Sequence, residues 1–232
     1  MTTSIEKKHS QVKPTIIAVV GASASGKTLF AQTIYDELLP ELGPNGISIL
    51  KEDAYYKSQS HMPMEERIKT NYDHPSAFEH DLLCGQLNAL TQGDAINSPV
   101  YCYKTHTRTD ETNKQQPTKI ILIEGIMLLT NKKLRECFDI KVYMDTPLDI
   151  CLIRRIQRDT IERGRTIDSI TKQYLDTVRP MYYQHIEPAK AHADIVITRG
   201  GKNRMAIEVI KAKIRQLTNE DTTNTIINNK NN

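Results

Sequence analysis

The segment GASASGKT, residues 21–28, holds the residues whose types and spacing could most clearly do chemistry. Two glycines, a lysine and a threonine stand at the offsets of the P-loop pattern G-x4-G-K-T. Glycines let a backbone bend around an anion because no Cβ is in the way, and loop N–H groups and a helix N-terminus then point at the phosphates. The pattern therefore predicts a phosphate cradle. Its residues are Gly21, Ala22, Ser23, Ala24, Ser25, Gly26, Lys27 and Thr28.

Two side chains of this loop have separate expected roles. Lys27 would reach the β- and γ-phosphates of a nucleotide, and the Thr28 hydroxyl would ligate Mg²⁺. A magnesium site also needs a carboxylate at the end of a neighbouring strand, and Glu124 follows KIILI, five residues that are mostly apolar. We expect Glu124 to act through a metal-bound water, because Mg²⁺ keeps several waters. The alternative is a strand-end carboxylate in water.

Asp53, in ILKEDAYYK, is the candidate proton acceptor. It lies just past a predicted strand, at the edge of a parallel sheet where ligands bind. A hydroxyl that accepts a phosphoryl group needs such a carboxylate to take its proton. An aspartate here could equally be a helix N-cap. A P-loop alone likewise does not separate a GTPase, an ATPase motor and a small-molecule kinase.

The elements that must position these residues follow from the hydrophobic pattern. Residues 15–20 are apolar throughout, as in a strand buried on both faces, and KIILIEGIMLL and DIKVYMDT are similar. GISILKED and ADIVIT predict two shorter strands. Amphipathic stretches between them predict helices, and the alternation predicts an α/β fold, a P-loop NTPase-type parallel sheet flanked by helices. The expected helices include LFAQTIYDELLPEL and the ranges 80–91, 167–190 and 203–217.

Two further parts of the chain are expected to project from this sheet. SPVYCYKTHTRTDET predicts a strand or a small β-hairpin-like insertion. PLDICLIRRIQRDTIERG predicts a helix that ends at Gly164. The basic residues between Arg154 and Arg165 extend past that end. That extension favours a mobile arginine-rich lid over the solvated helix face that such a run usually forms. We expect one domain over residues 14–217, a flexible lead-in over 1–13 and a disordered polar tail over 218–232.

Composition narrows the class of protein. The 232 residues carry 31 basic and 28 acidic side chains, a net charge of +3, which is too balanced for a general nucleic-acid binder. No apolar run approaches twenty residues, and the N-terminus has no apolar segment of a secretory signal, so we expect no membrane partner. The four cysteines form no CxxC pair and no zinc-type cluster, which is typical of reduced thiols in a cytoplasmic protein.

Several separate motifs in the right order make the chain resemble the uridine kinase (uridine–cytidine kinase) family. They are GASASGKT, EDAYY, NYDHPSAF, PVYCYKTHTR, IEG, RRIQRDTIERGR, QYLDTVRPMYYQHIEP and ADIVITRGG. The resemblance covers about residues 14–215, and NYDHPSAF followed by PVYxYxxHTR is far more specific than the P-loop. It implies transfer of the γ-phosphate of ATP to the 5′-hydroxyl of uridine or cytidine, giving UMP or CMP in pyrimidine salvage, with Mg²⁺ as the cofactor.

The resemblance also implies roles for individual residues. Asp53 matches the general base, and Arg155 and Arg165 match the lid arginines nearest the phosphates, which act with Lys27. Asp73 would bond the ribose hydroxyls, which physically suits a carboxylate that can accept from both. The full set matching the nucleoside side of the site is Tyr56, Asp73, Tyr101, His106, Arg158, Arg163 and Gln173.

Without the family, two of these residues have plainer interpretations. Tyr101 could be a half-buried strand residue, and His106 could be a surface histidine. Together a tyrosine and a histidine offer a pyrimidine a stacking face and a hydrogen-bond donor. The resemblance further implies a homotetramer with feedback inhibition by pyrimidine triphosphates. It does not say whether uridine or cytidine is the preferred acceptor, or whether ATP or GTP is the preferred donor.

One position departs from the family pattern. Members usually carry an aspartate after the tyrosine of PVYD, where this chain has Cys102. If that aspartate shapes the pocket, its replacement by cysteine would alter the affinity for the nucleoside or the choice of pyrimidine. If it only supports neighbouring backbone, the replacement would change little. Two rival hypotheses stay open at this stage. One is a phosphoribulokinase-like or pantothenate-kinase-like enzyme, and the other is a nucleotide-dependent regulatory or RNA-binding protein with a decayed kinase site.

Overall fold

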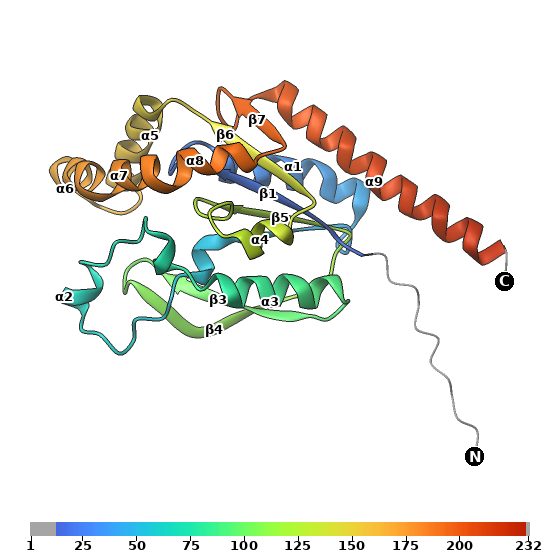
Figure 1. The fold of residues 1–232 in the computed structure, drawn as a ribbon, viewed down its shortest axis with the longest axis horizontal. Coiled ribbons are helices and arrows are strands. Elements are labelled where there is room, and N and C mark those ends of the chain that lie inside the picture. Colours follow the sequence, from blue (N-terminus) through green and yellow to red (C-terminus); the bar gives the residue numbers. More distant parts are fainter. Residues whose placement is uncertain (1–12, 231–232) are drawn as a thin grey trace, which may run out of the picture.

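The computed structural model describes the chain from residue 13 to residue 230 and has a five-stranded sheet at its centre (Figure 1). The strand order is β2-β5-β1-β6-β7, and every neighbouring pair is parallel. This confirms the expected α/β fold with a parallel sheet. The strands are β1 (Thr15–Gly21), β2 (Ile47–Lys51), β5 (Ile120–Gly125), β6 (Ile140–Asp145) and β7 (Ile195–Thr198).

Helices cover both faces of this sheet because alternate side chains of each strand point to opposite sides. In β1, Ile17 and Val19 pack with α1 (Lys27–Leu42) and α9 (Arg204–Lys230). Ile16, Ala18 and Val20 pack on the other side, with α3 (His80–Thr91) and α4 (Lys132–Glu136). A strand enclosed in this way must be apolar throughout, which is why residues 15–20 show no polar alternation.

The helical arm after β6 begins with α5 (Leu148–Ile161) and α6 (Ile167–Gln173). It continues through α7 (Arg179–Met181) and α8 (Glu187–Ala189), where we expected one helix over 167–190. Two π-helical turns, Tyr174–Val178 and Tyr182–Ile186, interrupt it. Each ends just before an X-Pro pair, and proline cannot donate the regular backbone hydrogen bond, so a wider turn accommodates its ring.

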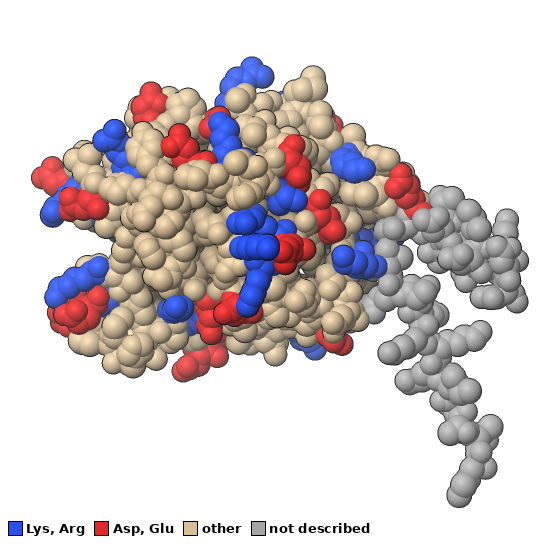
Figure 2. Space-filling view, in the orientation of Figure 1, with Lys and Arg blue, Asp and Glu red and all other residues tan. Residues whose placement is uncertain are grey.

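The tyrosine-rich stretch forms an antiparallel hairpin of β3 (Ile96–Cys102) and β4 (Thr107–Gln115), separate from the main sheet. In Figure 1 this hairpin lies beside α3, across the molecule from α5–α8. The short α2 (Met64–Arg67) lies in the loop that projects near it. Figure 2 shows the surface hollowed at the left edge, between these two parts, with acidic and basic side chains intermingled over the face in view.

The C-terminal segment differs from expectation. We expected a disordered tail from residue 218, whereas the backbone of α9 is helical through Lys230. No glycine or proline interrupts the sequence between residues 204 and 230, so nothing in the chain ends the helix. The lead-in over residues 1–12 and the last two residues lie outside the described part of the chain. No helix of the described part is long and apolar enough to span a membrane.

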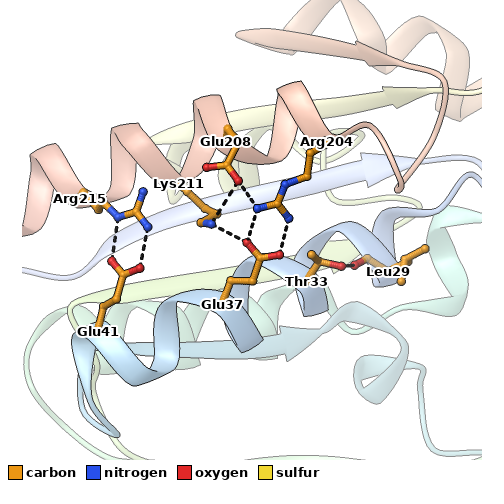
Figure 3. Close-up of polar contacts among 8 residues, drawn as sticks. All are labelled: Leu29, Thr33, Glu37, Glu41, Arg204, Glu208, Lys211 and Arg215. Atoms are coloured by element: carbon orange, nitrogen blue, oxygen red, sulfur yellow. Dashed lines mark hydrogen bonds and ion pairs between the residues drawn. The ribbon is translucent and has the colours of Figure 1, made fainter.

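Ion pairs fasten α9 to α1, the helix that opens with the P-loop lysine (Figure 3). Glu37 accepts hydrogen bonds from Nη1 and Nη2 of Arg204 and from Lys211, whose ammonium lies 2.5 Å away. Arg215 binds Glu41 through two nitrogens, at 2.8 and 2.6 Å. These contacts fasten the second half of α1 to α9.

We predict a pH-dependent stabilisation from Glu37. Its hydrogen bonds with Arg204 and Lys211 lower its pKa from 4.5 to about 2. The stabilisation is therefore complete above the unfolded value near 4.5 and disappears as the pH falls toward 2. Melting temperatures should show wild type above Glu37→Gln at pH 7, with a smaller gap at about pH 3. Glu65→Gln, on exposed α2, is the control for loss of a charge, and a gap that does not change with pH would contradict the prediction.

Candidate active site

The loop between β1 and α1 has the backbone that the glycine pattern predicts. Gly26 adopts a φ of +100° and Ala24 a φ of +63°, both in the left-handed region. A Cβ at Gly26 would lie 2.5 Å from the backbone nitrogen of Gly201, so only glycine fits this close approach. The Thr146 hydroxyl donates to the Ser25 carbonyl at 2.8 Å and holds the loop from the β6 side.

Thr28 and Glu124 meet beside this loop. The Thr28 hydroxyl donates to Glu124 Oε1 at 2.9 Å, and burial raises the pKa of Glu124, partly offset by the charge of Lys27. A hydroxyl and a carboxylate are the oxygen ligands that Mg²⁺ prefers, so this pair fits the cation. Among the described residues, no group of three or more His, Cys, Asp and Glu side chains could hold a metal ion.

Asp53 lies in the 3₁₀ turn Glu52–Tyr55, directly after β2. It is not the N-cap of this turn, a position that Lys51 occupies, and its Oδ2 accepts a hydrogen bond from the Tyr103 hydroxyl at 2.6 Å. Glu52, which is fully buried, anchors the turn: its two oxygens contact His80 Nε2 and the backbone N–H of Met127, each at 2.8 Å. The N-cap alternative for Asp53 therefore finds no support in its contacts.

Aromatic rings gather on the hairpin side of Asp53. The Tyr56 ring stacks on Phe78 with centroids 4.3 Å apart, and its centroid lies 4.9 Å from that of Tyr101. The Tyr72 ring lies 5.5 Å from His106. Burial lowers the pKa of His106, as do the nearby charges of lid arginines, so its imidazole is neutral at physiological pH.

Asp73 lies between this aromatic group and the arginines. Its side chain is 7% exposed, and burial raises its pKa while the charge of Arg155 opposes that shift. Asp73 and Arg155 line one pocket together with Ala22 and Ser23 of the phosphate loop. The structure thus brings a buried carboxylate, an arginine and the predicted phosphate cradle to one place.

The arginines of the expected lid share two hydrogen-bond or ion-pair partners. Arg155 and Arg165 both donate to the amide oxygen of Gln173, at 3.0 and 2.6 Å. Arg158 and Arg163 pair with the buried carboxylate of Asp159, at 2.8 and 3.4 Å. In this state the Gln173 oxygen is therefore occupied by two guanidinium groups.

The chain is similar to proteins of a known family. The model of the phosphoribulokinase / uridine kinase family matches residues 16–206. The chain belongs to this family. It is 56% identical over 212 residues to a uridine kinase of Aeromonas hydrophila, covering 91% of this chain and 98% of that protein. It is 57% identical over 202 residues to one of Vibrio cholerae, covering 87% and 95%. A solved D-glycerate 3-kinase of Cryptococcus neoformans has the same fold, with a TM-score of 0.59 at 16% identity over 80% of this chain and 83% of that one.

Three residues at this site were missed by sequence reasoning. Asp159 lies inside a basic run, and the sequence pattern did not identify it as the counter-ion of the arginines. Glu52 was overlooked beside Asp53. Tyr103 had a usable signal, because it follows Tyr101 at the two-residue spacing of one strand face, and the two ring centroids lie 5.3 Å apart.

We predict that Tyr103→Phe lowers kcat by about threefold to tenfold, the effect of losing one hydrogen bond that orients the Asp53 carboxylate. The KM for the acceptor should change less. Steady-state kinetics checks this. Tyr183→Phe is the matched control, because Tyr183 is 48% exposed against 47% for Tyr103 and also has an arginine over its ring. A raised KM with unchanged kcat would show instead that Tyr103 acts only on binding.

Proposed function

We propose that this protein transfers the γ-phosphate of ATP to the 5′-hydroxyl of uridine and cytidine, giving UMP and CMP. The observation that carries the proposal is the convergence of three parts in one family member. A P-loop with its Thr28–Glu124 pair lies beside Asp53. A buried carboxylate, Asp73, lies next to the tyrosine rings of the hairpin side. The relatives named uridine kinase, at 55–57% identity over most of this chain, support the same activity.

The phosphate side of the reaction needs positive charge. Lys27 lies at the cradle, and Arg155 and Arg165 come from the lid to spread the charge of the transferring phosphoryl group. Thr28 and Glu124 would hold Mg²⁺, which when bound neutralises charge on the phosphate oxygens. These residues supply electrostatic stabilisation and positioning, which is nearly all that phosphoryl transfer demands of a protein.

The acceptor side needs a base and a means of holding a nucleoside. Tyr103 occupies Oδ2 of Asp53, so Oδ1 is the oxygen that would take the 5′-hydroxyl proton. Asp73 would accept from the ribose 2′- and 3′-hydroxyls. A 2′-deoxyribose keeps only the 3′-hydroxyl, so this buried carboxylate would lose one of its two hydrogen bonds and ribonucleosides should be favoured.

The base of the nucleoside would lie against the aromatic residues. Tyr56 and Tyr101 offer faces for stacking, and the neutral His106 can donate from one nitrogen and accept at the other. A flat, neutral pyrimidine fits these groups better than a sugar phosphate, which would need an anion site of its own near Asp53. We therefore favour the nucleoside over ribulose 5-phosphate or pantothenate as the acceptor.

Several finer assignments belong to the same proposal. They are ATP rather than GTP as donor, a homo-oligomer that the family resemblance implies to be a tetramer, and a cytoplasmic location. The oligomer can be checked by light scattering, and the donor by direct competition between the two triphosphates.

A panel of acceptors tests the function. ADP release from Mg·ATP would be measured with uridine, cytidine, deoxycytidine, ribulose 5-phosphate, pantothenate and no acceptor. We expect stimulation by uridine and cytidine, with deoxycytidine poor. Turnover with ribulose 5-phosphate or pantothenate alone would assign another acceptor. ADP release that ignores every acceptor would favour the regulatory alternative.

We predict that Asp53→Asn lowers kcat by about 10²- to 10⁴-fold, because the amide cannot take the hydroxyl proton. The affinity for ATP, measured by calorimetry, should stay close to wild type. Asp94→Asn, at an exposed turn after α3, is the control for the same chemical change. Loss of ATP binding in Asp53→Asn would mark Asp53 as a structural residue.

A further inference from the structure

Asp159, in α5, is a fully buried carboxylate surrounded by four arginines. Its Oδ1 accepts from Arg158 Nε at 2.9 Å and lies 3.4 Å from a nitrogen of Arg163. Its Oδ2 lies 3.5 Å from Arg165 and 3.7 Å from Arg155 Nε. Its backbone oxygen also accepts the N–H of Arg165, at 3.0 Å. One residue thus contacts every arginine that the sequence assigned to the active site.

These contacts need a physical explanation, because gathering four guanidinium groups at one place costs repulsion. A solvated helix face would let the charges separate into water, but Asp159 has no exposed surface and Arg155 is only 6% exposed. A buried carboxylate among several cations offsets part of their repulsion and fixes their directions. An excess of positive charge remains, which suits an anionic ligand.

One N–H donor of this arginine cluster has no hydrogen-bond partner among the described residues. Arg155 Nε has no hydrogen-bond acceptor among the described residues, because Asp159 Oδ2 is beyond hydrogen-bonding distance. Arg155 faces Asp73, whose charge is the largest that favours its protonated form. The guanidinium of Arg163 lies 4.8 Å above the Tyr103 ring, and Tyr103 binds Asp53. The arginines held by Asp159 therefore reach both the phosphate side and the acceptor side of the site.

We infer that Asp159 is a positioning residue for phosphoryl transfer, which holds the lid arginines in the arrangement that receives the phosphates. The inference rests on the proposed kinase function. Preorganised charges stabilise a transition state because they need no rearrangement when the charge develops. Asp159 would contribute to kcat more than to the binding of the nucleoside, since its nearest partners are the arginines.

The test is Asp159→Asn, which keeps the shape of the side chain and removes its charge. We expect kcat with uridine to fall at least about tenfold, and KM for uridine to change less than about threefold. Trapping of ADP with aluminium fluoride, which mimics the transferring phosphoryl group, should weaken in parallel with kcat. Asp168→Asn, exposed at the start of α6, is the matched control and should keep wild-type kinetics. Far-UV circular dichroism checks that each variant is folded.

A second variant guards against a folding defect in the first. Gln173→Met removes the oxygen that Arg155 and Arg165 share but keeps the side-chain length. It should lower kcat in the same direction, by a smaller factor. A folded Asp159→Asn with wild-type kcat overturns the inference, as does a rise in KM at unchanged kcat. If Asp159→Asn does not fold, a wild-type kcat for Gln173→Met overturns it. Wild type that is inactive on every acceptor would instead refute the proposed function.

Discussion

The end of β5 is the point on which the active site depends. β1 and β5 are neighbours in a parallel register that pairs Val19 with Glu124, so the phosphate loop and this carboxylate must leave the sheet at the same edge. Gly125 follows immediately, and a Cβ there would lie 2.4 Å from the Cβ of Glu52. The absent side chain makes room for Glu52, whose carboxylate anchors the turn that carries Asp53. Two consecutive residues of one buried strand therefore position both the predicted metal ligand and the predicted base.

Electrostatic contacts order the arginines of the lid, whereas packing fixes the residues at the edge of the sheet. Its arginines are held by Asp159 and by Gln173, two acceptors on successive helices of the arm, with the left-handed Gly164 between them. A shared acceptor couples the arginines, because a group that moves one of them must break contacts that the others use. This explains how side chains as long as arginine can be ordered near a phosphate site. A nucleotide that binds as proposed would meet side chains that are already held, so less of their conformational entropy would remain to be lost.

The parts of the fold that could be predicted from sequence are those with a local cause. Buried strands such as residues 120–125 show continuous apolar runs, and the range 80–91 predicted α3 without error. The pattern G-x4-G-K-T indicated a loop whose backbone needs glycine, and Gly26 takes a left-handed φ there. The helical extension to Lys230 was missed because a polar composition was taken as disorder, although no residue there breaks a helix.

The missed contacts are all long-range or hidden by composition. The bond from Tyr103 to Asp53 joins residues fifty positions apart, and the spacing of Tyr101 and Tyr103 does not indicate that partner. Asp159 is surrounded in sequence by basic residues, so a count of charge along the chain hides the carboxylate that contacts four of them. Gln173 has no chemical signature of its own, and its role as acceptor for two arginines requires the arm to fold back along α5. The contacts of Tyr103 and Gln173 follow from tertiary placement, whereas the four-residue spacing of Asp159 from Arg155 and from Arg163 is already present in the sequence.

Cys102 is the position where the sequence left two alternatives open. Hydrogen bonds from the side chain and backbone N–H of Thr105 and from the backbone N–H of Lys104 lower the pKa of this thiol, so its sulfur is directed at the turn between β3 and β4. An aspartate at that position would accept from the same backbone groups, as in an Asx turn. The contacts therefore favour support of the hairpin backbone over a place in the nucleoside pocket. Sulfur is a weaker acceptor than a carboxylate, so the exchange should affect the order of this turn more than the choice of pyrimidine.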